Sequence, residues 1–305
     1  MEKMTEIFNL RENQLEAINK SIENDFSCGI HYHATGTGKS WIGILLLYEF
    51  NKRYTQGNIL WICERKDILK QQFNKETIKN RGFSNILKKF NVLDFSINKE
   101  PKWYDSLNSS IFWGKPFLCI INRSFLTSKK KYQNIKKEIN LVIHDECHSI
   151  ENKTTQQFYQ WLQKVNQNKF KIETRIIGFT ATPEKIDPLN KIISQYSIYD
   201  AFLDNVILPP KIIWVKNQTN PPLQDIIKII QSYVKKLPYK KIIVWCGMID
   251  LCISLSELWS KYFKNFLIAI DTSKNFENSF NKKIKDYNQF KNANNNAILF
   301  CASKH

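Results

Sequence analysis

Apolar and polar positions along the first part of the chain form two kinds of segment. Short continuous apolar runs, typical of buried strands, occur at residues 28–32, 58–63, 117–121, 141–144 and 175–179. Between them lie segments with the length and pattern of helices, such as 41–48 and 67–75, and an irregular stretch at 91–114. Strands that alternate with helices predict an α/β fold built on a parallel sheet.

The pattern changes after residue 205. Pro-Pro pairs bracket a short apolar strand at 211–215, an arrangement typical of a connection between domains. Further on, predicted helices at 223–237, 251–263 and 281–290 alternate with predicted strands at 241–246, 266–270 and 297–301. We therefore predict a first domain at 1–205, a linker at 206–222 and a partial second domain at 223–305.

Composition narrows the class of protein. Lysine and arginine outnumber aspartate and glutamate by 45 to 28, and the resulting net charge of +17 favours nucleic acid or nucleotides as partners. Lysine also accumulates in proteins encoded by A/T-rich genes, which is the alternative explanation. The seven cysteines form no Cys-x-x-Cys pair, the N-terminus is polar, and the longest apolar run is too short for a membrane span. We expect an intracellular, cytoplasmic protein without a membrane segment.

Residues 33–40, His-Ala-Thr-Gly-Thr-Gly-Lys-Ser, lie between a predicted strand and a predicted helix. This order is that of a P-loop, whose glycines let backbone N–H groups point at a phosphate beside a helix N-terminus. Lys39 would bind the β- and γ-phosphates, and Ser40 would ligate Mg²⁺. A strict P-loop has glycine where His33 stands, so an ordinary glycine-rich turn is the alternative. The residues expected to bind the nucleotide here are Thr35, Gly36, Thr37, Gly38, Lys39 and Ser40.

Asp145 and Glu146 follow the predicted strand at 141–144. Two adjacent carboxylates at a strand end suit hydrolysis of a nucleotide: Asp145 would hold Mg²⁺, directly or through water, and Glu146 would polarise the attacking water. A zinc site is the alternative. Its candidate ligands are His144, Cys147, His148, Cys28, His31 and His33.

Two further pairs carry weaker signals. Arg11 and Gln14 are three positions apart on a predicted helix, and a glutamine amide can both donate to and accept from adenine, although a solvated helix face has the same pattern. Thr180 and Thr182 follow the strand at 175–179, where hydroxyls would relay hydrogen bonds from the γ-phosphate site. Threonines in such places also serve as helix caps or turn formers.

Together these segments resemble the superfamily 2 helicases and translocases. Arg11-x-x-Gln14, Ala34-Thr-Gly-Thr-Gly-Lys-Ser40, Asp145-Glu-Cys-His148 and Thr180-Ala-Thr182 occur in the order of that superfamily. The pattern is similar to the DEAD/DEAH-like group, particularly the branch of restriction-enzyme motor subunits and related large-DNA-virus helicases, in which the first P-loop glycine is often absent. The resemblance implies two RecA-like domains, ATP and Mg²⁺ as cofactors, and nucleic acid as a partner, with DNA favoured over RNA.

The resemblance also implies a role for each matching position. Gln14, with Arg11 beside it, would contact adenine. The expected catalytic residues are Glu146, which would activate water, Lys39, which would bind phosphate, and Asp145, which would hold Mg²⁺. The residues that would couple hydrolysis to movement are His148, Thr180 and Thr182. The candidate nucleic-acid contacts are Arg65 and Arg123, which follow the second and third predicted strands, with Glu64 in place of the family's proline.

In this superfamily a longer fifth motif and an arginine-finger helix follow the strand that corresponds to 297–301, and the sequence contains neither. We therefore expect a fragment whose last strand lies at or near an unfinished sheet edge, and a continuation or partner that supplies the arginine finger. An ATP-switched nucleic-acid-binding subunit with little hydrolysis is the alternative function, and a small-molecule P-loop kinase is a third. A/T-rich coding suits a large DNA virus, and hence a viral factory or virion.

Overall fold

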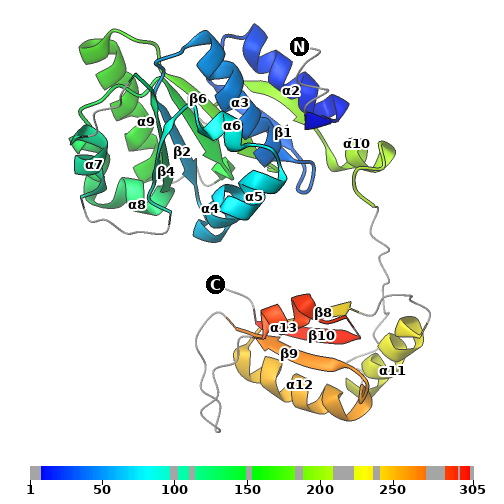
Figure 1. Ribbon diagram of the computed structural model, residues 1–305. Helices are drawn as coiled ribbons and strands as arrows, with labels where there is room; N and C mark the ends of the chain where they lie inside the picture. The colour runs from blue at the N-terminus through cyan, green and yellow to red at the C-terminus, as the bar shows by residue number, and fades with distance from the viewer. Residues whose placement is uncertain are drawn as a thin grey trace. The chain divides into compact units, whose positions relative to one another are not determined.

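The chain consists of two compact units, Met1–Pro210 and Lys211–His305, each with its own sheet (Figure 1). The computed structural model describes residues 8–96, 102–109, 114–148, 153–182, 188–208, 223–235, 241–272, 286–294 and 296–302. Residues 209–222, which include most of the predicted linker and its strand, lie outside the described residues.

Seven strands of the described part of the first unit form its central sheet, and all neighbouring strands in it are parallel. Its spatial order is β3-β4-β2-β5-β6-β1-β7. The five predicted strands are all present, so the predicted α/β fold with a parallel sheet is confirmed. The strands are β1 (Gly29–His33), β2 (Ile59–Cys63), β3 (Asn91–Asp94), β4 (Phe117–Asn122), β5 (Leu141–Asp145), β6 (Arg175–Thr180) and β7 (Ile192–Tyr196).

The two edge strands, β3 and β7, are the ones that the apolar pattern does not predict. Residues 91–114 were expected to be irregular, and that expectation is wrong for Asn91–Asp94, which form β3, and for Trp103–Ser109, which form the helix α7. Partly buried and exposed positions alternate along β3, and β7 is exposed at Ile192 and Gln195. Because an edge strand is covered less completely than a central one, it lacks the continuous apolar run that marks β2 or β4.

Helices cover both faces of the sheet (Figure 1). One apolar core lies between the sheet and α2–α6, and the other lies between the sheet and α7–α9. Side chains of one strand alternate between the two cores: in β2, Trp61 belongs to the first core, and Leu60 and Ile62 belong to the second. The helices are α2 (Glu12–Glu23), α3 (Lys39–Arg53), α4 (Lys66–Phe73), α5 (Lys75–Asn80), α6 (Ser84–Leu87), α7 (Trp103–Ser109), α8 (Arg123–Thr127), α9 (Lys153–Val165) and α10 (Ile198–Leu203), with a 3₁₀ turn at Ser128–Asn134 and a π turn at Asn166–Phe170.

The helix predicted at 67–75 is α4, which ends at Phe73, and a second short helix, α5, begins at Lys75. Asn74 has extended backbone dihedrals, and its side chain accepts a hydrogen bond of 2.7 Å from the Thr77 backbone N–H. This N-cap ends one helix and begins the next. As a result α4 is short, and its buried face carries Leu69 and Gln72 toward the sheet.

In the described residues of the second unit, three strands form a parallel sheet in the order β8-β10-β9. The strand β10 therefore lies between the other two, and of the two places expected for it, at or near an unfinished sheet edge, the edge itself is wrong. A crossover connection can insert a later strand between earlier ones. Residues 281–285 of the helix predicted at 281–290 lie outside the described residues. The elements are α11 (Leu223–Val234), β8 (Lys241–Cys246), α12 (Ile249–Tyr262), β9 (Leu267–Asp271), α13 (Tyr287–Asn292) and β10 (Ala297–Ala302).

Across the described residues of both units, no helix has the length and apolar surface that a membrane-spanning segment needs.

Candidate nucleotide-binding site

The carboxyl ends of β1, β6 and β5, which are neighbours in the sheet, meet at one edge of the first unit. Open parallel sheets place their ligands at this edge. β1 leads into residues 34–38, β6 ends at Thr180 and β5 ends at Asp145. The sheet order thus brings together motifs that lie far apart along the chain.

The loop after β1 depends on two glycines with left-handed backbone dihedrals, Gly36 with a φ of 87° and Gly38 with a φ of 94°. A Cβ atom on Gly38 would lie 2.2 Å from Gln14 Nε2, so the loop also packs tightly against α2. The buried Thr37 hydroxyl donates a 2.7 Å hydrogen bond to the Ala34 carbonyl. These constraints hold the loop in one compact turn before α3.

Lys39 is the first residue of α3, and its side chain lies inside the turn. Only 7% of Lys39 is exposed, and its Nζ donates to the carbonyls of His33 at 3.2 Å and Ala34 at 3.5 Å. Burial, with a contribution from the Lys39 ammonium, lowers the pKa of His33 to about 4. His33 is therefore neutral, and its Nε2 lies 2.7 Å from Ser194 Oγ. The protein accommodates this imidazole at the position where a strict P-loop has glycine.

Gln14 connects α2 to this loop. Its Nε2 donates to the Thr37 carbonyl at 3.3 Å, and its Oε1 accepts from the Arg11 backbone N–H at 3.1 Å. Gln14 is buried, while Arg11 is exposed at the start of α2. Both side chains line the same cavity as the loop, and their contact with adenine is taken up as a proposal below.

The acid pair stands at the end of β5 with unequal surroundings. Asp145 is 3% exposed, and burial, reinforced by the nearby Glu146 charge, raises the pKa of Asp145 to about 6. Glu146 has a φ of 55°, a left-handed conformation that costs energy for a residue with a side chain. Its backbone N–H donates to Asp145 Oδ1 at 3.0 Å, and its Oε2 lies 3.4 Å from His148 Nδ1. Strain of this kind often occurs at functional sites.

Gln72 is a site residue that the sequence pattern does not reveal. Its Nε2 donates to Ser40 Oγ at 2.8 Å and to Asp145 Oδ2 at 2.5 Å. The amide thus joins the two residues that were predicted to ligate Mg²⁺. Gln72 carries no motif signal, and only its spacing of three from the buried Leu69 places it on the inner face of α4.

These groups line one cavity of about 370 Å³. Trp41, Ile68, Gln72 and Arg81 line it without having been predicted, and the Arg81 guanidinium lies 5.7 Å from the centre of the Trp41 ring. The predicted residues that line the cavity are Arg11, Gln14, Thr35, Gly36, Gly38, Lys39, Ser40, Asp145 and Glu146.

The three residues expected to couple hydrolysis to movement lie outside the cavity lining. Thr180 is fully buried, and its hydroxyl both accepts from the Thr182 N–H and donates to the Thr182 carbonyl, each at 3.0 Å. His148 is exposed and faces Glu146. The two threonines therefore form a local turn at the end of β6, and the coupling role stays a prediction.

The two arginines proposed to contact nucleic acid differ in their surroundings. Arg65 is exposed at the start of α4. Arg123 is only 14% exposed, and its Nε forms an ion pair with Glu64, the residue that replaces the family's proline. Glu64 Oε1 also lies 3.6 Å from Nε2 of the buried His144. Arg123 is thus held by the protein's own carboxylate.

The zinc alternative has no support among the described residues, in which no group of three or more His, Cys, Asp or Glu side chains could hold a metal ion. His144 Nδ1 lies 2.5 Å from Tyr159 Oη, and His31 lies between Ser21 and Ser194. These histidines are therefore engaged in separate hydrogen bonds on different parts of the sheet.

Residues 7–185, more than half of the chain, match the family model of the type III restriction enzyme res subunit. The chain belongs to this family. Its first unit is accordingly a superfamily 2 helicase-like domain with a RecA-like sheet, as the motif order predicted. At the level of the family, such domains are nucleic-acid-dependent ATPases. No curated protein sequence matches this res-family chain.

Solved structures resemble the res-family chain in fold. An ATP-dependent type ISP restriction-modification enzyme, LlaBIII, bound to DNA, is similar with a TM-score of 0.61 and 11% identity over 96% of this chain and 24% of that one. Mss116p bound to ssRNA and AMP-PNP is similar with a TM-score of 0.53 and 15% identity, over 96% of this chain and 63% of that one. The res-family chain therefore spans less than two thirds of either protein.

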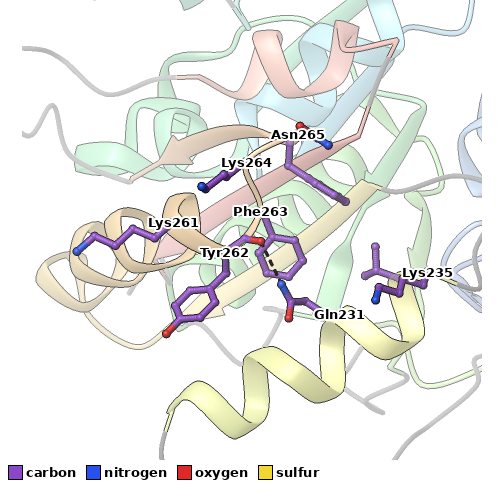
Figure 2. Close-up of a pocket in the computed structure, with 9 residues that line it drawn as sticks. Gln231, Lys235, Lys261, Tyr262, Phe263, Lys264 and Asn265 are labelled. Atoms are coloured by element: carbon purple, nitrogen blue, oxygen red, sulfur yellow. Dashed lines mark hydrogen bonds between the residues drawn. The ribbon is translucent and has the colours of Figure 1, made fainter.

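A second cavity, of about 340 Å³, lies in the second unit, where α11 and α12 end (Figure 2). Gln231 Nε2 donates to the Tyr262 carbonyl at 3.1 Å, as the dashed line in Figure 2 marks. Its lining includes Lys235, Lys261 and Lys264. Because helix C-termini carry partial negative charge, these lysines complement the two helix ends, and the position does not favour an anionic ligand.

Proposed function

We propose that this chain is the ATP-binding motor part of a superfamily 2 helicase or translocase, which couples ATP hydrolysis to movement on nucleic acid, with DNA favoured over RNA. The observation that carries the proposal is the single cavity onto which Lys39, Ser40, Asp145 and Glu146 all open. Membership of the res-subunit family and the net charge of +17 support it, because a basic surface attracts the phosphate backbone.

In the proposed complex, the backbone N–H groups of residues 35–39 and the Lys39 ammonium bind the phosphates. Lys39 now donates to carbonyls of its own loop and would turn from them to the β- and γ-phosphates. Gln14 and Arg11 lie at the same cavity and would contact the adenine. The close packing of Gln14 on Gly38 would then make adenine contact sensitive to the shape of the phosphate loop.

The residues present fit a magnesium ion. Ser40 Oγ and Asp145 Oδ2 accept hydrogen bonds from the same Gln72 nitrogen, so two hard oxygen atoms already face one point. Mg²⁺ bound there would neutralise charge on the transferred phosphate. Ser40 and Asp145 would hold it, directly or through water.

Glu146 is proposed as the general base that orients and deprotonates the attacking water. Its left-handed backbone places its side chain at the cavity and beside His148, on the surface of the protein. Hydrolysis of the γ-phosphate would be coupled to movement of the nucleic-acid-binding surface by His148, Thr180 and Thr182.

The proposed site is tested by ATP binding to Lys39→Ala, with Lys52→Ala as the matched control. Lys52 lies on the same helix, α3, but is exposed and pairs with Glu49. Lys39→Ala should weaken ATP binding by at least 100-fold, and Lys52→Ala should leave it unchanged. Equal ATP affinity in wild type and Lys39→Ala would refute the assignment.

The motor function is tested by phosphate release with and without DNA or RNA. Nucleic acid should stimulate release, and its binding should weaken steeply with salt, because Lys and Arg displace condensed counterions. ATP binding without stimulated release, in the presence of a supplied arginine-finger segment, would identify an ATP-switched binding subunit. Release that is indifferent to nucleic acid, with no salt-dependent binding, would identify a small-molecule kinase.

A further inference from the structure

Gln72 holds a central position in the cavity although no sequence motif includes it. It is 5% exposed, and α4 is fixed against the sheet on either side of it by Leu69, which is fully buried, and by Phe73, whose ring packs edge-on against Trp61 at 5.0 Å. The Gln72 side chain therefore points into the cavity from a well-anchored helix.

Hydrogen-bond chemistry determines which end of the Gln72 amide faces the acid. An ionised Asp145 only accepts hydrogen bonds, so the Gln72 NH₂ group must face it, at 2.5 Å. The same nitrogen has a second hydrogen for Ser40 Oγ at 2.8 Å. The amide nitrogen thus lies between the two oxygens and donates to both.

The other end of the amide is not satisfied. Gln72 Oε1 is buried and has no hydrogen-bond partner among the described residues. Burying a carbonyl oxygen without a hydrogen-bond partner costs free energy. The two hydrogen bonds that the amide nitrogen donates must offset this cost. Such a group is suited to move when a stronger ligand for its two acceptors arrives.

We propose that Gln72 is a positioning residue whose amide nitrogen occupies the place of the cation between Ser40 and Asp145 and is displaced when the metal binds. This inference rests on the proposed function, because it takes these two oxygens as the metal ligands. The amide keeps Ser40 and Asp145 facing one another and separates the Asp145 carboxylate from the hydroxyl until a divalent cation replaces it. Metal binding therefore has to break two hydrogen bonds, and Gln72 sets the concentration of metal at which the site loads.

The test is a Mn²⁺ titration of the whole chain without nucleotide, followed by the EPR signal of free Mn²⁺. Gln72→Ala should lower the dissociation constant for Mn²⁺ at least five-fold, since the competing amide is gone. Gln71→Ala is the matched control, because Gln71 is the neighbouring glutamine on α4 and is exposed. It should leave the constant unchanged. Adding Asp145→Asn to Gln72→Ala should abolish the tight binding and so assign it to this site.

A second variant guards against a folding defect. Gln72→Met retains the length of the side chain and removes both donors, so it should tighten Mn²⁺ binding as Gln72→Ala does, with a wild-type circular dichroism spectrum. Unchanged or weaker Mn²⁺ binding in these variants overturns the inference, because it would mean that Gln72 supports the bound metal or does not meet it.

The outcome is separable from that of the proposed function. If ATP binds in a Lys39-dependent manner and the Gln72 variants do not tighten Mn²⁺ binding, only the role of Gln72 is refuted. If the variants tighten Mn²⁺ binding and wild type fails to bind ATP, the displacement of the Gln72 amide by metal is supported and the assignment of the ATP site is refuted.

Discussion

Gly38 and Gln14 are so closely packed that a methyl group on Gly38 would stand 2.2 Å from the Gln14 amide nitrogen. Since that nitrogen donates to the Thr37 carbonyl, the first turn of α2 and the phosphate loop share one contact. Any side chain at position 38 has to break this contact as well as adopt a left-handed backbone.

Gly38→Ala should therefore destabilise the protein more than a left-handed glycine alone explains. Gly114→Ala is the matched control, because Gly114 has a φ of 65° with nothing within 4 Å of its added Cβ. Gly114→Ala should lower the free energy of unfolding by about 1–2 kcal/mol. Gly38→Ala should lower it further and weaken ATP binding. Urea denaturation of both variants and of Gly38→Ala/Gln14→Ala measures the contact, and equal losses in the two single variants would contradict it.

Asp145 should make the protein less stable as the pH rises. Burial raises the pKa of Asp145 from 3.8 to about 6, so the folded state binds its proton more tightly than the unfolded state does. The stability it confers is complete below pH 4 and is lost as the pH rises through 6. Asp145→Asn should thus be more stable than wild type at pH 8, by about 2–3 kcal/mol, with a smaller difference at pH 4.5. Urea denaturation at the two pH values tests this, and a difference independent of pH would contradict it.

The strained backbone of Glu146 should lower the stability of the protein, whereas its carboxylate should be needed for ATP hydrolysis. Its φ of 55° costs about 1 kcal/mol for a residue with a side chain and nothing for glycine. Glu146→Gly should therefore be about 1 kcal/mol more stable than Glu146→Gln, which loses the same charge but retains the strained backbone. Both variants should lose about 10²–10⁴-fold in ATP hydrolysis, as expected when a general base is removed, and should still bind ATP. Equal stability of the two variants would show that the backbone carries no strain.

Glu64 should weaken nucleic-acid binding by holding Arg123. Glu64→Ala removes the ion pair and leaves the guanidinium with its 3.4 Å hydrogen bond to Thr155 Oγ1, which is easier to exchange for a phosphate. Affinity for nucleic acid should rise severalfold, and the slope of log affinity against log salt should steepen by about 0.7–0.9 for one new phosphate contact. Glu76→Ala, an equal charge change at an exposed position of α5, is the control. Adding Arg123→Ala should cancel the gain, and a gain that survives this addition would exclude Arg123 as the contact.

Local patterns in the sequence were sufficient to predict the inner strands and the phosphate loop. β2 and β4 are covered on both faces, and therefore appear as continuous apolar runs. The phosphate loop combines glycines, a lysine and a serine within a few residues, so its motif is visible without any structure. The edge strands β3 and β7 were not predicted because partial exposure breaks their apolar pattern.

The tertiary structure alone decided which side chains meet. Gln72 contacts Ser40 and Asp145 across separations of 32 and 73 residues, and Arg123 lies against Glu64 because β2 and β4 are neighbours in the sheet. The sequence does not distinguish a solvated glutamine or arginine from one that forms a hydrogen bond or an ion pair with a residue far away along the chain. The sequence by itself thus determined the five inner strands of the first sheet, the motifs and the family, whereas strand order determined which amide lies between the two candidate metal ligands and which arginine is held by a carboxylate.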